Sequence, residues 1–105
     1  MILFMELIHA AKQLEALGNP TRLAVYRLLI QMGPEGVPVG KIQAALTIPA
    51  STLSHHIAKL MQAGLIQQKR ESRTLYCQAD YENMNSLICF MVDNCCSEGL
   101  PLHLQ

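Results

Sequence analysis

The stretch from Ile48 to Gln78, IPASTLSHHIAKLMQAGLIQQKRESRTLYCQ, decides the expected fold. Its first half repeats apolar residues with the period of a helix that is buried along one side: Leu53, Ile57, Leu60 and Met61. Gly64 follows at the position where a glycine commonly ends a helix. Residues 65–68 and 74–78 then alternate like strands around Lys69-Arg70-Glu71-Ser72-Arg73. The stretch therefore predicts a helix followed by a two-stranded hairpin with a basic turn.

The other side of this helix is polar and contains no Asp or Glu between Ser51 and Gln62. Hydroxyl, imidazole and ammonium groups of this kind hydrogen-bond base edges and phosphates. A polar-faced helix beside a basic hairpin is typical of a winged helix-turn-helix, in which the helix enters the major groove and the hairpin, or wing, lies along the backbone. The alternative is an ordinary amphipathic helix and hairpin. The predicted DNA-binding residues are Ser51, Thr52, Ser54, His55, His56, Lys59, Lys69, Arg70 and Arg73.

Charge is distributed unevenly along the chain, although its formal net charge is zero. From Ser51 to Tyr76 there are four cations against Glu71, a net of +3, and the rest of the chain has a net of −3. The positive charge is therefore focused on the predicted helix and wing, as nucleic-acid binding requires. Apolar runs are only a few residues long, and the opening has no basic segment. We expect no membrane span, no secretion signal and a cytoplasmic location.

The remaining sequence predicts one mainly α domain, residues 1–105, with a core at 19–78. Helices are expected at 3–17, 20–32, 39–46 and 80–96, with a short edge strand at 37–39. Asn19 and Asp80 are expected to cap the second and last helices, and Thr47 or Ser51 the helix before the hairpin. In the helix at 39–46, Ile42, Ala45 and Leu46 are expected to point inward.

The first and last helices are not needed for a winged-helix core, yet each has an apolar stripe. Leu7 and Leu14 lie in the first stripe, and Leu87 and Met91 in the other. We expect a homodimer that buries these four residues between two copies, because two-fold dimers match palindromic DNA sites. The alternative is that both stripes close the core of a single chain.

The chain resembles the ArsR/SmtB family of bacterial winged-helix repressors over about residues 6 to 96. The resemblance rests on the motifs at 17–23 (LGNPTRL), 51–57 (STLSHHI) and 63–66 (AGLI), together with Leu60, Tyr76 and the basic wing. It implies a homodimer that binds double-stranded operator DNA and releases it when an inducer occupies a sensing site. The familiar sensing motifs of the family are absent, because the helix at 39–46 and the helix at 20–32 have no cysteine, and the helix at 80–96 has no histidine.

The sequence Asp93-Asn94-Cys95-Cys96 is the remaining cluster of soft ligands. It is similar to an atypical branch of the family in which a C-terminal cysteine pair and a third cysteine bind trivalent arsenic, although the third cysteine is missing here. Cys95 and Cys96 are candidates for As(III) binding or for sensing oxidation, and the alternative is that they have no sensing role. Adjacent residues of an intact helix point about 100° apart, so the two thiols converge only if the last turn opens. Cys77 and Cys89 are expected to be small core residues.

No catalytic constellation is apparent, so we do not expect an enzyme. The competing class is a winged-helix protein-interaction module that never touches DNA, which a net charge of zero favours. An ArsR-type repressor without a metal site is a further alternative.

Overall fold

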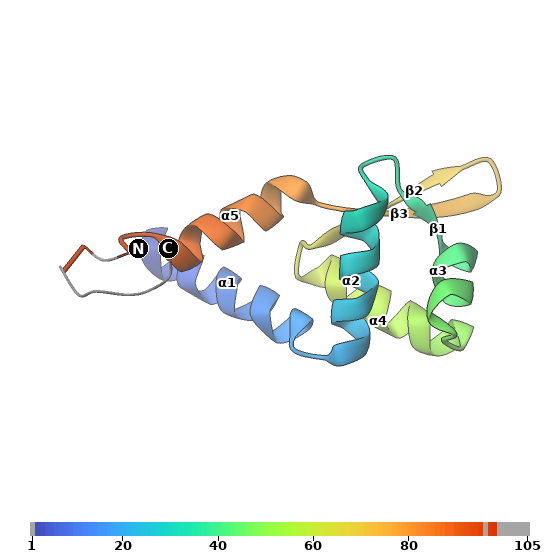
Figure 1. Ribbon diagram of the computed structural model, residues 1–105, viewed down its shortest axis with the longest axis horizontal. Coiled ribbons are helices and arrows are strands. Elements are labelled where there is room, and N and C mark those ends of the chain that lie inside the picture. Colours follow the sequence, from blue (N-terminus) through green and yellow to red (C-terminus); the bar gives the residue numbers. More distant parts are fainter. Residues whose placement is uncertain (1, 96, 99–105) are drawn as a thin grey trace.

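The computed structural model describes residues 2–95 and 97–98, with the side chains of 2–5 left out. Five helices and three strands follow one another as the sequence predicts. Their bounds are α1 (Ile2–Leu17), α2 (Pro20–Met32), β1 (Val37–Pro38), α3 (Val39–Leu46), α4 (Ala50–Gln62), β2 (Ile66–Glu71), β3 (Thr74–Ala79) and α5 (Tyr81–Val92). α1 and α5 lie side by side at one end of the molecule, and α3, α4 and the β2–β3 hairpin lie toward the other (Figure 1).

The strands form one antiparallel sheet in the order β1-β3-β2. Pro38 lies in the edge strand β1, where its missing N–H costs no ladder hydrogen bond. The hairpin is longer than expected, because Lys69 pairs with Tyr76 and Arg70 with Leu75. Both cations therefore belong to β2, and only residues 72 and 73 form the turn. The sequence prediction ended the strand too early because a solvent-exposed hairpin can continue without apolar alternation.

The hydrophobic core lies where α2, α3 and α4 pack on the sheet. Its fully buried side chains are Val25, Leu29, Ile42, Leu53, Leu60, Leu65 and Cys77. The apolar stripe of α4 supplies Leu53, Ile57 and Leu60, whereas Met61 is 38% exposed at the edge of the stripe. Burial raises the pKa of the Cys77 thiol, which is consistent with the expected role as a small core residue.

Two helix boundaries are fixed by groups that the sequence identifies. The Asn19 side chain accepts hydrogen bonds from the backbone N–H groups of Thr21 (2.9 Å) and Arg22 (3.1 Å) at the start of α2. At the end of α4, Gly64 has a φ of 77°, and the N–H of Leu65 donates to the carbonyl of Leu60 at 3.0 Å. This is the Schellman ending that glycine favours.

The expected cap of α4 is wrong. α4 begins after Pro49, without any side-chain cap, and Thr47 instead ends α3 in the left-handed conformation at a φ of 53°. Proline presets the backbone angle of a helix start, so the chain turns into α4 without a hydroxyl. Ala45 is exposed rather than inward, because the eight residues of α3 bury mainly Ile42.

α5 ends at Val92, short of the expected residue 96, with Asp93 as its C-cap. Cys89 is exposed, so its expected place in the core is wrong. Leu87 points inward, and a residue two positions later lies about 200° around the helix, on the opposite side. The fold is thus mainly helical with a small antiparallel sheet, a winged helix-turn-helix. Within the described residues, no helix is long and apolar enough to span a membrane.

Candidate nucleic-acid interface

The outward face of α4 lies opposite its buried stripe. Ser51, Thr52, Ser54, His55 and Lys59 are exposed along this face, and His56 is half-buried at its margin. Because Leu53, Ile57 and Leu60 anchor the other side in the core, this face of the helix has a fixed orientation. The structure therefore gathers the six predicted residues of α4 on or beside one surface.

The charged residues of the segment that forms this surface are all basic up to Arg70. Between Gly36 and Arg70 the chain contains Lys41, Lys59, Lys69 and Arg70 and no carboxylate. This segment comprises β1, α3, α4 and most of β2, so the first exposed acid near the hairpin is Glu71. A polyanion that approaches α4 meets no repulsive side chain from these elements.

The wing cations differ in their surroundings. The ammonium of Lys69 lies 3.1 Å from Glu71, and both side chains are exposed. Such a surface pair is worth about 0–1 kcal/mol, so a phosphate can displace it. Among the described residues, Arg70 and Arg73 form no salt bridge. We therefore regard these two arginines as the more available charges of the predicted set.

His56 is held by Arg22, a contact that the sequence did not reveal. The Arg22 guanidinium lies 3.3 Å from Nδ1 of His56 and also donates from Nε to the carbonyl of Ala16 at 2.7 Å. Burial, followed by the charge of Arg22 and then by His55, lowers the pKa of His56. The imidazole is therefore neutral near pH 7, accepts at Nδ1, and keeps an N–H on Nε2.

The C-terminal end of α4 is fixed by side chains of the two terminal helices. Gln13 of α1 donates to the carbonyl of Ala63 at 3.2 Å, and Asn83 of α5 donates to the carbonyl of Gly64 at 2.6 Å. Carbonyls at a helix end lack intrahelical partners, so these bonds satisfy them. No sequence pattern marks Gln13 or Asn83, because each acts on a residue distant in the chain.

The residues predicted for a dimer interface do not share one environment. Leu7 is 53% exposed, Leu14 42% and Met91 58%, whereas Leu87 is only 8% exposed and packs within its own chain. Ile88, beside Leu87, is 53% exposed. The outward apolar stripe of α5 thus contains Ile88 and Met91 rather than Leu87.

The predicted sensing pair is only partly visible. Cys95 lies beyond α5 and is exposed, with its N–H donating to the carbonyl of Val92 at 2.9 Å. Cys96 lies outside the described residues. In the part of the chain that the structure describes, no three His, Cys, Asp or Glu residues come together as a metal site.

Known proteins share both the sequence and the shape of this chain. Residues 17–68 match a family described as a helix-turn-helix domain. The chain is 39% identical over 62 residues to the HTH-type transcriptional regulator MJ1325 of Methanocaldococcus jannaschii. The matched stretch covers 59% of this chain and 67% of that protein.

Two solved structures extend the comparison. HlyU from Vibrio cholerae is 25% identical, with a TM-score of 0.68 and coverage of 85% of this chain and 94% of HlyU. The homodimeric winged helix-turn-helix DNA-binding domain of Mb0332 from Mycobacterium bovis, described as "a possible ArsR-family transcriptional regulator", is 26% identical. Its TM-score is 0.66, and the match covers 92% of this chain and 90% of that domain.

Proposed function

The chain belongs to the ArsR-type winged helix-turn-helix transcriptional regulators, and we propose that it acts as a homodimeric repressor that binds operator DNA and releases it when an inducer is bound. The observation that supports this most strongly is the outward face of α4, which is polar, free of carboxylates and flanked by a basic hairpin. Such a protein works in the cytoplasm of a bacterial or archaeal cell, where its DNA is.

In this proposal α4 enters the major groove and the hairpin lies along the backbone. His55 is central on the exposed face and Ser54 lies toward its margin, and both contact base edges. Ser51, Thr52 and Lys59 contact phosphates or neighbouring bases, and His56 contributes its outward N–H. Lys69, Arg70 and Arg73 supply charge to the backbone.

The proposed dimer pairs the α1–α5 ends of two chains. Support comes from Leu7, Leu14 and Met91, which are large apolar side chains exposed at that end of a single chain. Mb0332, with the same fold, is described as homodimeric. A two-fold dimer presents two copies of α4 to two half-sites, so we expect the operator to be palindromic.

The salt dependence of binding tests the role assigned to the wing. Neutralising Arg70 or Arg73 with glutamine should remove one phosphate contact per protomer. The slope of log affinity against log salt should then flatten by about two units per dimer, since each contact contributes roughly 0.9. Fluorescence anisotropy on a labelled duplex from the region upstream of the gene, at several salt concentrations, measures this slope.

The matched control is Lys12→Gln, which removes an exposed cation on α1 at the far end of the molecule. Its slope should equal that of the parent protein. If Arg70→Gln and Arg73→Gln also leave the slope unchanged, the wing does not contact the backbone.

The inducer in this proposal acts at Cys95 and Cys96, by binding As(III) or by oxidation of the thiols. Because α5 already ends at Val92, Cys95 is not held in the geometry of a helix. Ligation there would strain the adjacent dimer interface and change the spacing of the two α4 helices. A coupling of roughly 1–3 kcal/mol, a factor of about 5–150 in operator affinity, is typical.

Arsenite and, separately, a mild oxidant should release operator DNA from the parent protein and not from Cys95→Ser/Cys96→Ser. The same anisotropy assay reports the release. If the double variant responds like the parent, or the parent responds to neither reagent, the pair is not the sensor.

A further inference from the structure

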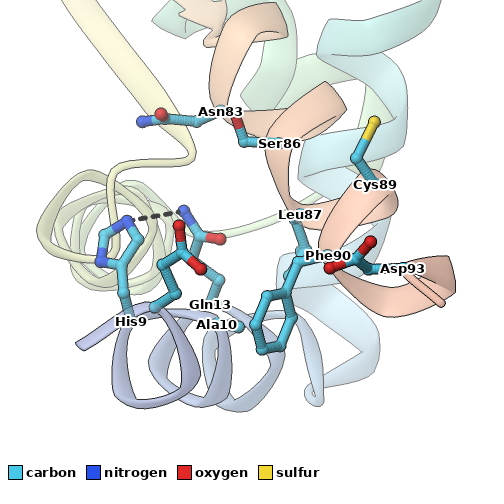
Figure 2. Close-up of a pocket in the computed structure, with 10 residues that line it drawn as sticks. His9, Ala10, Gln13, Asn83, Ser86, Leu87, Cys89, Phe90 and Asp93 are labelled. Atoms are coloured by element: carbon cyan, nitrogen blue, oxygen red, sulfur yellow. Dashed lines mark hydrogen bonds between the residues drawn. The ribbon is translucent and has the colours of Figure 1, made fainter. Parts of the chain in front are cut away.

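A cleft of about 410 Å³, lined by both polar and apolar side chains, lies between α1 and α5, beside the C-terminal end of α4 (Figure 2). Its volume lies within the range of small-molecule sites, roughly 300–1,000 Å³. Neither the DNA-binding surface nor the cysteine pair accounts for it. The residues that line it come from both terminal helices and include charged, polar and aromatic side chains.

The charge of the cleft has a single sign. Glu6 on α1 and Asp93 at the end of α5 both line it, together with His9, and no lysine or arginine does among the described residues. An anionic ligand would be repelled, whereas a cation in the cleft would be attracted by both carboxylates. The selection is therefore for a positively charged ligand.

Gln13 adds a hydrogen-bond acceptor with a defined orientation to the cleft. Its side-chain nitrogen lies 3.2 Å from the carbonyl of Ala63, and a carbonyl only accepts, so the nitrogen must face α4. The same nitrogen is 3.2 Å from Nε2 of His9. The amide oxygen then points away from His9, into the space between α1 and α5 (Figure 2).

This oxygen has an open acceptor position. Gln13 is only 2% exposed, and none of the hydrogen bonds found among the described residues ends on its oxygen. The oxygen is not one of the fully buried unpaired side-chain atoms, so it is open to the cleft, where a ligand that donates a hydrogen bond can take the place of water.

The remaining wall is apolar. Leu87 and Phe90 line the cleft on α5, and Ala10 lines it on α1. An aromatic ring attracts a cation over its face and also packs against apolar groups. The cleft thus combines an anionic part with a surface for a hydrocarbon body.

We propose that this cleft binds an organic ammonium ion, a primary amine with an aromatic or aliphatic body. The ammonium lies between Glu6 and Asp93 and donates to the oxygen of Gln13, and the body packs on Leu87 and Phe90. A bare metal ion would leave the apolar wall unused, and the cleft lacks a third closely placed acidic, cysteine or histidine ligand among the described residues.

The site is placed to affect α4, and this part of the inference rests on the proposed function. Gln13 touches the ligand with its oxygen and the end of α4 with its nitrogen. Drawing Glu6 and Asp93 toward one ammonium closes α1 on α5 and shifts the support of α4. The amine would therefore be an inducer that acts independently of Cys95 and Cys96.

The test is an NMR titration of the full-length protein, without DNA, using 2-phenylethylamine as the ligand and 2-phenylethanol as its neutral counterpart. The amine should give saturable shifts in the Gln13 side-chain amide and in the backbone amides of Ala63 and Gly64. Glu6→Gln/Asp93→Asn should weaken binding at least tenfold. Glu15→Gln, an exposed carboxylate of α1 outside the cleft, should bind like the parent.

The proposal is overturned if the alcohol binds as well as the amine, if the Glu6/Asp93 variant binds like the parent, or if the shifts lie elsewhere. Since no DNA is present, these results do not depend on the proposed function. In a separate anisotropy assay, the saturating amine should weaken operator binding at least fivefold in the parent and in Cys95→Ser/Cys96→Ser. Unchanged operator affinity with the amine bound overturns the inducer role.

Discussion

Replacing Leu14 or Met91 with glutamate is expected to turn the protein into a monomer and to abolish useful operator binding. Both side chains are large, apolar and exposed at the α1–α5 end of a single chain, where we place the partner. Each substitution buries two unpaired carboxylates per dimer, and an uncompensated buried charge costs several kcal/mol, about 3–5 in measured cases.

Operator affinity should fall with the dimer. Two linked α4 helices bind two half-sites with an avidity on the order of 10²–10⁴ above that of one. Analytical ultracentrifugation reports the mass, and anisotropy reports the affinity. Lys12→Glu, a charge reversal on another face of α1, is the matched control and should remain a dimer. If both Leu14→Glu and Met91→Glu remain tight dimers, the apolar stripes of α1 and α5 do not form the dimer interface and serve the core of a single chain.

The second large effect is expected on the outward face of α4. Ser54→Ala or His55→Ala should cost roughly 1–3 kcal/mol at each half-site, and therefore about twice that for a dimer on a palindrome. Both residues are exposed above the buried Leu53 and Ile57, so truncation should not disturb the core. The loss should be larger on operator DNA than on a random duplex, because contacts to base edges provide the specificity.

Asn85→Ala, an exposed polar position on α5, is the control and should bind both duplexes like the parent. Equal losses on operator and random DNA would assign Ser54 and His55 to phosphate contact. No loss on either would remove them from the interface.

Local patterns in the sequence were sufficient for the order of the elements and for most of their boundaries. Asn19 and Asp80 cap helices with their side chains and Gly64 ends one through its backbone, so these local effects can be predicted without tertiary information. The stripe Leu53, Ile57 and Leu60 placed the outward face of α4 correctly, because its period is that of the helix itself.

The sequence could not provide the tertiary contacts. The contact of Arg22 with His56 and the hydrogen bond of Gln13 to Ala63 join residues far apart in the chain, and no spacing rule indicates them. The rotation of α5 was also missed. Its stripe is broad, so Leu87 was predicted for the dimer interface and Cys89 for the core, whereas packing turns Leu87 inward and leaves Ile88 and Cys89 exposed.

The terminal helices show the same limit in another way. The apolar stripe of α1 predicted Leu7 and Leu14 for contact with a second copy, and the structure leaves both exposed, while α1 packs within the chain through Ala10, Gln13 and Ala16. Small residues permit a close approach of α1 to its neighbours, and the leucines are then available for a second copy. A hydropathy pattern does not distinguish burial within one chain from burial between two copies.

The most direct test of the central claim is the affinity of the parent protein for a duplex from the region upstream of its gene, compared with a random duplex of equal length and at the same salt concentration. We predict one dimer per operator and an operator affinity at least about 10³-fold above that for random DNA, the lower end of typical specific binding. Equal affinity for the two duplexes, or no binding to either, would contradict the account and favour a winged-helix module that binds another protein.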